Sequence, residues 1–245
     1  MSTEHLVPDE LRRLYYVKEW RNATGVLQTA CPREWEDIAE VLRAFRLLRS
    51  EVEAAGKNRS PISRQIDGAF YARGWTEENF NASVTVIGTG RPNRRKRTFT
   101  RSQNSQSDRP VGLSYESPTH AVDCFRGRVA LEVEWNNKDP FFDRDLNNFR
   151  LLFELRVIDV GVIITRASEL QKIFNALGKG KSYGNSTTHH AKLWPRLDGG
   201  GGGGCPVLTF AIKPELYVDD GPPTRETRAR IAAQPPTESG QDEEQ

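Results

Sequence analysis

Hydrophobic residues recur along the chain at two spacings, and each spacing predicts a different kind of element. Between residues 33 and 55 they recur every three or four positions, which is the period of a helix with one buried face. These positions are Ile38, Val41, Leu42, Phe45, Leu48 and Val52. The pair Asp139-Pro140 suits the start of a second predicted helix, 140–156, and a third is predicted over 169–177.

Shorter apolar runs predict strands. Residues 121–125 and 128–135 flank a tight turn at Arg126-Gly127, which predicts a β-hairpin. Residues 159–165 form a nearly continuous apolar run, typical of a strand that is buried on both faces and parallel to its predecessor. Further strands are predicted at 83–87 and at 207–212, with 216–218 as an extension. The mixture of strands and helices predicts an α/β fold.

The pattern divides the chain into one large domain and a tail. We predict a domain over residues 1–220 with its core at 33–218, because 245 residues are enough to bury a substantial core. A basic and polar surface excursion interrupts this domain at 91–118, and the acidic stretch 221–245 is predicted to be a disordered tail. Loops are predicted where polar residues or glycines cluster, at 178–197 and 199–204.

The composition excludes several classes of protein. Five Trp, 11 Phe and six Tyr within a hydrophobic fraction of 36% argue against full disorder. No run approaches the roughly 20 apolar residues that span a bilayer, and the first ten residues lack the order of a secretory signal, so we expect a cytoplasmic protein. The three cysteines include no C-x-x-C pair, which argues against a disulfide framework and a zinc site.

The predicted hairpin gathers acidic side chains. Glu132 and Glu134 share one face of the strand 128–135, and the partner strand brings Asp123 close to Glu132. Carboxylates about 5 Å apart repel by roughly 3 kcal/mol per pair at an effective dielectric constant near 20. A divalent cation such as Mg²⁺ would relieve that repulsion.

This chemistry suits hydrolysis of a phosphodiester. We predict Asp123 and Glu132 as direct Mg²⁺ ligands, the carbonyl of Val133 as a third, and Glu134 as the group that orients or deprotonates the attacking water. The alternative is that Glu132 and Glu134 lie on a solvated strand face, paired with Arg128 or Lys138.

At these residues the chain resembles a known group of nucleases. A hairpin with Asp, eight residues and then Glu-x-Glu, followed by a helix and a buried parallel strand, is similar to the PD-(D/E)XK nuclease core. The block A-V-D-C-F-R-G-R-V-A-L-E-V-E-W-N-N-K-D, with D-R-D-L-N-N-F and I-D-V-G-V-I-I-T-R after it, resembles type II restriction endonucleases of the BglII and BstYI family over 119–166.

The resemblance implies a restriction-endonuclease-like mixed β-sheet core flanked by helices. It implies that Asp123 and Glu132 bind Mg²⁺, and that the third catalytic position, often Gln in this family, falls on Glu134. Because no Lys occupies that position, the identity of the general base stays open. The resemblance also implies an upstream active-site residue after Trp75, which suggests Glu78.

The resemblance further implies a homodimer that embraces double-stranded DNA, cleaves a short palindromic site to leave 5′-phosphates, and works beside a cognate DNA methyltransferase. Predicted DNA contacts come from the basic run, from the residues after the catalytic strand and from a later loop: Arg94, Arg95, Lys96, Arg97, Asn136, Asn137, Lys138, Thr188 and His189. Two alternatives remain, a non-catalytic duplex-binding protein and a structure-directed repair nuclease on the same core.

Overall fold

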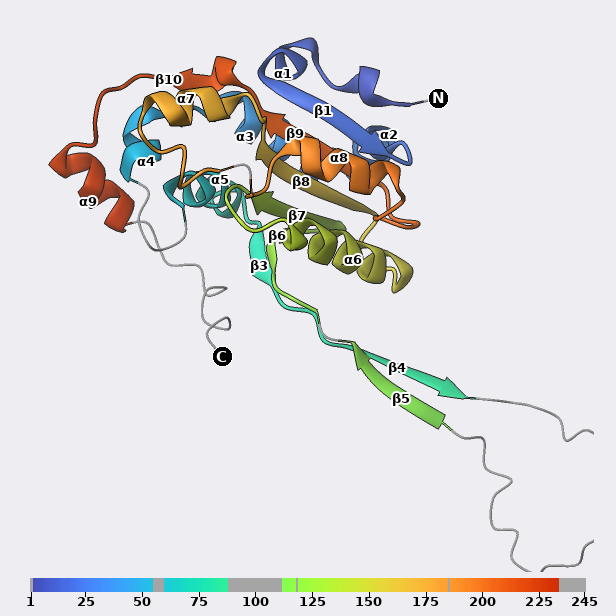
Figure 1. Ribbon diagram of the computed structural model, residues 1–245. Coiled ribbons are helices and arrows are strands. Elements are labelled where there is room, and N and C mark those ends of the chain that lie inside the picture. The colour runs from blue at the N-terminus through green and yellow to red at the C-terminus, as the bar shows by residue number, and fades with distance from the viewer. Residues whose placement is uncertain (1, 55–59, 88–111, 118, 185, 234–245) are drawn as a thin grey trace, which may run out of the picture. The chain divides into compact units, whose positions relative to one another are not determined.

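The computed structural model describes residues 2–54, 60–87, 112–117, 119–184 and 186–233 (Figure 1). The chain forms two compact units. The larger unit comprises Met1–Glu78 and Ala121–Gln245, and the smaller comprises Asn79–His120. No helix within the described residues combines the length and the apolar character needed to cross a membrane.

The large unit is built on a six-stranded mixed sheet. In spatial order its strands are β1 (Tyr15–Trp20), β9 (Val207–Ile212), β8 (Val160–Arg166), β7 (Val129–Glu134), β6 (Val122–Arg126) and β3 (Thr76–Glu78). The central strands β7, β8 and β9 are parallel, while β1, β6 and β3 are antiparallel to their neighbours. The predicted α/β fold with a mixed sheet is therefore confirmed, as is the parallel pairing of the hairpin's second strand with the buried strand that follows.

Helices cover both faces of this sheet (Figure 1). Helices α6 (Pro140–Glu154) and α8 (His190–Asp198) lie on one face, and α3 (Pro32–Ala44) and α5 (Pro61–Tyr71) lie on the other. Shorter helices complete the unit: α1 (Asp9–Leu14), α2 (Ala23–Ala30), α4 (Arg49–Ala54), α7 (Leu170–Ala176) and α9 (Arg225–Ala233), with 3-10 turns at Glu4–Leu6 and Pro214–Leu216.

The alternation of side chains along β7 sends its residues into two different layers. Val129, Leu131 and Val133 belong to the main hydrophobic cluster, which includes residues of α3 and α5. The intervening residues, which include Glu132 and Glu134, therefore point to the face that α6 covers. All six residues of β7 are buried, which contradicts the alternative of a solvated strand face.

Helix α6 packs very close to β8. A Cβ atom built on Gly161 of β8 would lie 2.3 Å from Cδ2 of Phe149 on α6, so a side chain does not fit at that position. Phe142, Phe149 and Leu152 of α6 are all buried. The sheet-facing side of α6 is therefore held directly against the strands that carry the acidic residues.

Several predicted elements differ from the structure for identifiable reasons. The helix predicted over 33–55 is interrupted, because Phe45 takes an extended conformation and Leu47–Leu48 forms β2, which pairs with β10 (Tyr217–Val218). Residues 216–218 therefore contribute to a separate two-stranded sheet instead of extending β9. The hairpin turn lies at Gly127-Arg128, one residue later than predicted, because Arg126 pairs with Val129.

Helices and strands also lie outside the predicted limits of the core, 33–218. Strand β1 and helix α2 precede residue 33, yet β1 pairs with β9 and Leu27 of α2 is buried in the main cluster. The loop predicted over 178–197 contains α8, and the tail predicted to be disordered over 221–245 contains α9. Helix α9 is held to the domain, since Arg64 donates to the carbonyl of Ile231 at 3.3 Å. The rest of that tail, 234–245, lies outside the described residues.

In its described residues, the small unit contains an antiparallel strand pair. Strands β4 (Ala82–Ile87) and β5 (Gly112–Ser117) pair from Ala82 with Ser117 to Ile87 with Gly112. The strand predicted at 83–87 is confirmed. Most of the predicted basic excursion, including Arg94, Arg95, Lys96 and Arg97, lies outside the described residues.

Candidate active site

The β6–β7 hairpin brings Asp123 and Glu132 together. The backbone N–H of Asp123 donates to Oε2 of Glu132 at 3.3 Å, and the N–H of Val133 donates to Oδ2 of Asp123 at 2.9 Å. The hydroxyl of Tyr71 on α5 donates to the carbonyl of Asp123 at 3.0 Å, which fixes β6 at this point. The predicted proximity of Asp123 to Glu132 is therefore found in the structure.

The backbone of Val133 points toward Asp123. In a strand, the N–H and C=O of one residue point to the same side. Because the N–H of Val133 faces Asp123, its carbonyl oxygen faces the same edge of the strand. Asp123, Glu132 and this carbonyl thus supply hard oxygen donors at one place, which is the donor set that Mg²⁺ prefers.

Asp145 joins these acids from α6. It is fully buried, and one of its carboxylate oxygens lies within 4.8 Å of one from Glu132. The sequence reasoning did not select Asp145. A signal was present, because Asp145 lies three residues after Phe142 and four before Phe149, on the stripe of α6 that faces the sheet.

The environment of Glu134 favours its protonated form. Only 1% of Glu134 is exposed, and burial raises the pKa of its carboxyl group well above the usual range. The negative charge of Asp145 and a hydrogen bond with it raise the pKa further, and the charges of Asp123 and Glu132 add to the effect. Four acidic residues thus lie together near the C-terminal end of β7, on the face that α6 covers: Asp123, Glu132, Glu134 and Asp145.

Polar neighbours orient this cluster. The side-chain amide of Asn137 donates to Oε2 of Glu134 at 2.9 Å, and the hydroxyl of Thr165 donates to the Glu134 carbonyl at 2.7 Å. The Arg144 guanidinium lies 3.4 Å from Asp145 and 3.8 Å from Glu134. Arg144 is partly exposed, so it forms a positively charged edge beside the buried acids.

Glu78 lies on β3, beside the strand that carries Asp123. It pairs with Val122 of β6, and its side chain is half-buried. Trp75, which precedes β3, is buried and donates from Nε1 to Asp37 at 2.9 Å. The register therefore places Glu78 one residue along from Asp123 on the neighbouring strand, and its catalytic role stays a prediction.

The residues predicted to read DNA lie in different environments. Asn137 and Lys138 are exposed, and Asn136 is half-buried and donates to the carbonyl of Ser182 at 2.9 Å. Thr188 and His189 are buried, and burial together with the charge of Arg166 lowers the pKa of His189 to about 4. In this structure Thr188 and His189 are therefore packed inside the fold, with His189 neutral.

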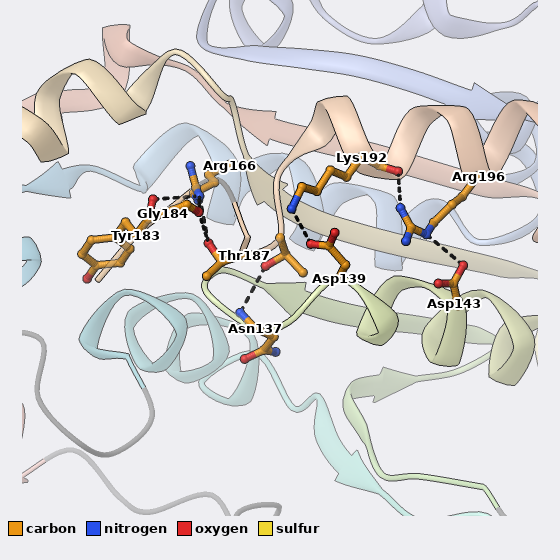
Figure 2. A network of polar contacts seen from close by, with 10 residues as sticks. Asn137, Asp139, Asp143, Arg166, Tyr183, Gly184, Thr187, Lys192 and Arg196 are labelled. Carbon is orange, nitrogen blue, oxygen red and sulfur yellow. Dashed lines mark hydrogen bonds and ion pairs between the residues drawn. The ribbon is translucent and has the colours of Figure 1, made fainter. Parts of the chain in front are cut away.

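Two ion pairs join α8 to the start of α6 (Figure 2). Lys192 lies 2.5 Å from Asp139, and Arg196 lies 2.8 Å from Asp143. Asp139 was predicted to cap α6, but its side chain makes no capping hydrogen bond and pairs with Lys192 instead. The ion pairs fix the two helices that cover the acidic face of the sheet.

The sequence was compared with known families and proteins. The family model described as restriction endonuclease BglII/BglIII matches residues 15–212. These limits coincide with the first residue of β1 and the last residue of β9, so the match spans all six strands of the main sheet. No curated protein matched the chain. Because the match covers most of the sequence and includes every acid of the cluster, the chain belongs to the BglII/BglIII restriction endonuclease family and is a site-specific deoxyribonuclease.

Proposed function

We propose that this protein is a Mg²⁺-dependent type II restriction endonuclease that cleaves both strands of DNA at a short palindromic site and leaves 5′-phosphates. The observation that carries the proposal is the convergence of four carboxylates at one end of β7: Asp123, Glu132, Glu134 and Asp145. Burying like charges together is unfavourable, so such a cluster is more typical of a functional site than of a stabilising one.

The donor set supports a hard divalent cation. Asp123, Glu132 and the carbonyl of Val133 would hold Mg²⁺, because they offer oxygen atoms at the same edge of the hairpin. When bound there, Mg²⁺ would supply charge stabilisation to the scissile phosphate and acidify a bound water. This site matches the pattern of the PD-(D/E)XK nucleases, to which we assign the chain on that basis.

Glu134 is the proposed proton acceptor. Burial and the neighbouring acids raise its pKa, so the carboxylate has more affinity for a proton than an ordinary surface Glu has, and Mg²⁺ held beside it would favour the ionised form that a base needs. Asn137 holds one of its oxygens by a hydrogen bond, and Asp145 bonds to the same carboxyl group. These contacts would direct Glu134 toward the attacking water. We propose Glu78 as a further member of the site on the basis of the family resemblance; its partner on β6 is Val122, the residue before Asp123.

Duplex DNA is the proposed partner, bound by a homodimer whose two-fold axis matches that of the palindrome. Among the described candidates, we propose Asn137 and Lys138 for contacts at base edges, because both are exposed and adjoin the acidic cluster. The cations Arg94, Arg95, Lys96 and Arg97 are proposed phosphate contacts on the basis of sequence. A cognate methyltransferase would protect the host's own sites, without a stable complex.

Digestion of sequenced plasmids tests the proposal. Wild-type protein with Mg²⁺ should yield discrete fragments with fixed ends carrying 5′-phosphates, and chelation with EDTA should stop the reaction. Asp123→Asn should abolish cleavage, whereas Asp159→Asn, which changes a partly exposed acid paired with Arg128, should leave it unchanged.

Three outcomes would contradict the proposal in different ways. Intact plasmid at every metal concentration would favour the non-catalytic duplex-binding alternative. Nicks confined to branched DNA would favour a repair nuclease. Fragmentation that persists in Asp123→Asn would remove the acidic cluster from the mechanism and indicate a contaminating nuclease.

A further inference from the structure

Arg166, the last residue of β8, is buried in an unusual environment. Only 1% of it is exposed, and burial lowers the pKa of its guanidinium to about 10. Within the described residues Arg166 forms no ion pair, and its Nε has no hydrogen-bond partner. Burying a cation without a carboxylate is costly, so its remaining contacts need an explanation.

Those contacts all reach one loop (Figure 2). Nη2 of Arg166 donates to the carbonyl of Tyr183 at 3.1 Å, to the carbonyl of Gly184 at 3.2 Å and to the hydroxyl of Thr187 at 2.9 Å. We call residues 182–184 and 186–188 the Tyr183 loop. Carbonyl groups inside a protein require hydrogen-bond donors. From inside the domain, Arg166 donates to the carbonyls of Tyr183 and Gly184 at the start of this loop and to the Thr187 hydroxyl near its end.

The start of the Tyr183 loop has an anchor that does not depend on these polar contacts. The Tyr183 ring stacks on Phe174 with centroids 4.5 Å apart, and Trp135 meets both rings edge-on at 6.1 Å. The guanidinium of Arg166 lies 5.5 Å from the centre of the Phe174 ring. Removal of the guanidinium would therefore leave the loop attached while freeing its later residues.

The other end of the Tyr183 loop pairs with the segment that follows the catalytic strand. The N–H of Thr188 donates to the carbonyl of Asn137 at 2.9 Å, and the N–H of Asn137 donates to the Thr188 hydroxyl at 3.2 Å. Lys138 and Thr187 form an antiparallel bridge. The loop thereby sets the backbone of Asn137 and Lys138, the two exposed residues proposed to read bases.

The same segment is connected to the acidic cluster. Asn137 donates its side-chain amide to Glu134, and Thr165, the residue before Arg166, donates to the Glu134 carbonyl. Polar contacts therefore run from the interior of the sheet, through the Tyr183 loop and Asn137, to the proposed proton acceptor. The buried Arg166 side chain is thereby connected both to the exposed residues proposed to contact bases and to Glu134, the proposed proton acceptor.

We infer that Arg166 is a positioning residue that holds the Tyr183 loop against residues 136–138 and thereby sets how accurately the enzyme discriminates its site from related sequences. The inference rests on the proposed function. Base discrimination depends on donors and acceptors held at fixed positions, and each good contact to a base is lost when its backbone shifts. All three contacts come from Nη2, at the far end of the guanidinium, a position that the ammonium group of the shorter Lys side chain does not reproduce.

The test measures discrimination separately from rate. Once the cleavage site is mapped with wild-type protein, kcat and KM are measured on duplexes that carry the site and on duplexes with one altered base pair. The variants are Arg166→Met, Arg166→Lys and Thr187→Val, with Arg128→Met as the matched control at the opposite end of β7, where Arg128 pairs with the partly exposed Asp159. Thermal unfolding of each variant reports its folded fraction.

We expect Arg166→Met to reduce the ratio of kcat/KM between the site and its altered versions by about tenfold or more, because one to several base contacts are weakened. The reduction in kcat on the correct site should be smaller than this change in ratio. Thr187→Val should reduce the ratio by about threefold or more, because it removes the hydrogen bond from Arg166 and the one that the Thr187 hydroxyl donates to the Gly184 carbonyl. Arg166→Lys should fall between wild type and Arg166→Met, and Arg128→Met should match wild type.

The effects of the double variant Arg166→Met/Thr187→Val should be less than additive, because both changes remove the Arg166–Thr187 contact and Thr187→Val further removes only the bond from Thr187 to the Gly184 carbonyl. The inference would be overturned if folded Arg166→Met discriminated between sites within twofold of wild type. It would also be overturned if the losses of rate and of discrimination in the variants only followed the loss of folded protein. If Arg166→Met does not fold, Thr187→Val and Arg166→Lys decide by the same criteria. Failure of the wild-type protein to cleave any plasmid is a separate result that refutes the proposed function itself.

Discussion

The two ends of the β6–β7 hairpin differ in the charges that surround their acidic side chains. At the turn end, two acids have cationic partners: Arg126 lies 2.6 Å from Asp37, and Arg128 lies 2.6 Å from Asp159. The hydrogen bond from Arg128 lowers the pKa of Asp159. At the other end, acids from β6, β7 and α6 lie beside one another, and the pKa of Glu134 is raised.

This contrast separates the ion pairs, which contribute to the stability of the fold, from the crowded acids, which are proposed to serve catalysis. Partly exposed ion pairs at the turn end are individually weak and tolerate change. Buried like charges at the other end work against folding and persist where catalysis or binding requires them. The hairpin thus carries its proposed catalytic residues at the end where electrostatics is least favourable, and the following predictions test that difference.

The largest effect is expected from Glu132→Gln. Cleavage should fall by about a thousandfold or more, since the cation site contributes several kcal/mol to the reaction and each 1.36 kcal/mol corresponds to about tenfold in rate. The metal-free variant should nevertheless be at least as stable as wild type, because one of the crowded charges is gone. Cleavage kinetics and thermal unfolding of the same preparation check both parts. A variant that cleaves normally would show that the crowded end has no catalytic role.

Addition of Mg²⁺ should distinguish the two ends by stability alone. At a concentration well above its dissociation constant, a ligand that binds only the folded state stabilises it by about 1–3 kcal/mol. We expect Mg²⁺ to raise the Tm of wild type and of Asp159→Asn, but not of Asp123→Asn or Glu132→Gln. Calorimetric unfolding with and without EDTA provides the measurement. An equal rise in all four proteins would place the cation elsewhere.

The pH dependence of stability should have opposite signs at the two ends. The raised pKa of Glu134 means that its contribution to metal-free stability is present below the usual carboxyl pKa, about 4.5, and is lost as the pH rises. The lowered pKa of Asp159 means that its contribution is present above the usual value, about 3.8, and is lost as the pH falls.

Urea unfolding of metal-free protein across pH measures these slopes. Glu134→Gln should flatten the decline in stability above pH 4.5, and each unit of pKa difference removed corresponds to about 1.36 kcal/mol. Asp159→Asn should flatten only the acid side. Parallel curves for wild type and Glu134→Gln would show that Glu134 titrates normally.

The smallest effect is expected from the ion pair at the turn end. Asp159→Asn should cost less than about 1 kcal/mol in the free energy of unfolding, because the pair with Arg128 is partly exposed, and the loss should shrink further in high salt. Denaturant titration at two salt concentrations checks this. A loss above about 3 kcal/mol would make this end a buried network, contrary to the comparison.

The sequence was sufficient for the parts of the fold that follow local patterns. The apolar run that became β8 and the alternation that became β7 are direct consequences of burial, so the hairpin and its parallel neighbour were predictable. Helix α8 was missed because its sequence is mixed and contains Pro195, and α3 was extended too far because the break at Phe45 depends on β2 pairing with β10. Such long-range pairings leave no local pattern.

The candidate site was predictable to the same extent. Asp123, Glu132 and Glu134 lie on one hairpin, so strand alternation and a short turn were enough to bring them together. Asp145 comes from a helix whose depth on the sheet the sequence does not encode locally. The burial of Thr188, by contrast, depends on a bridge between Lys138 and Thr187 across about fifty residues.

Gly161 has a consequence for any attempt to engineer this enzyme. Because Phe149 occupies the space of a missing side chain, the separation between α6 and the sheet is set by a residue that contributes no functional group. An alanine introduced there to stiffen the strand would lift the helix, widen the gap between Asp145 and Glu132, and relax the crowding of the acids. A search for more thermostable versions that replaces glycines indiscriminately would therefore loosen the packing that holds Asp145 close to Glu132.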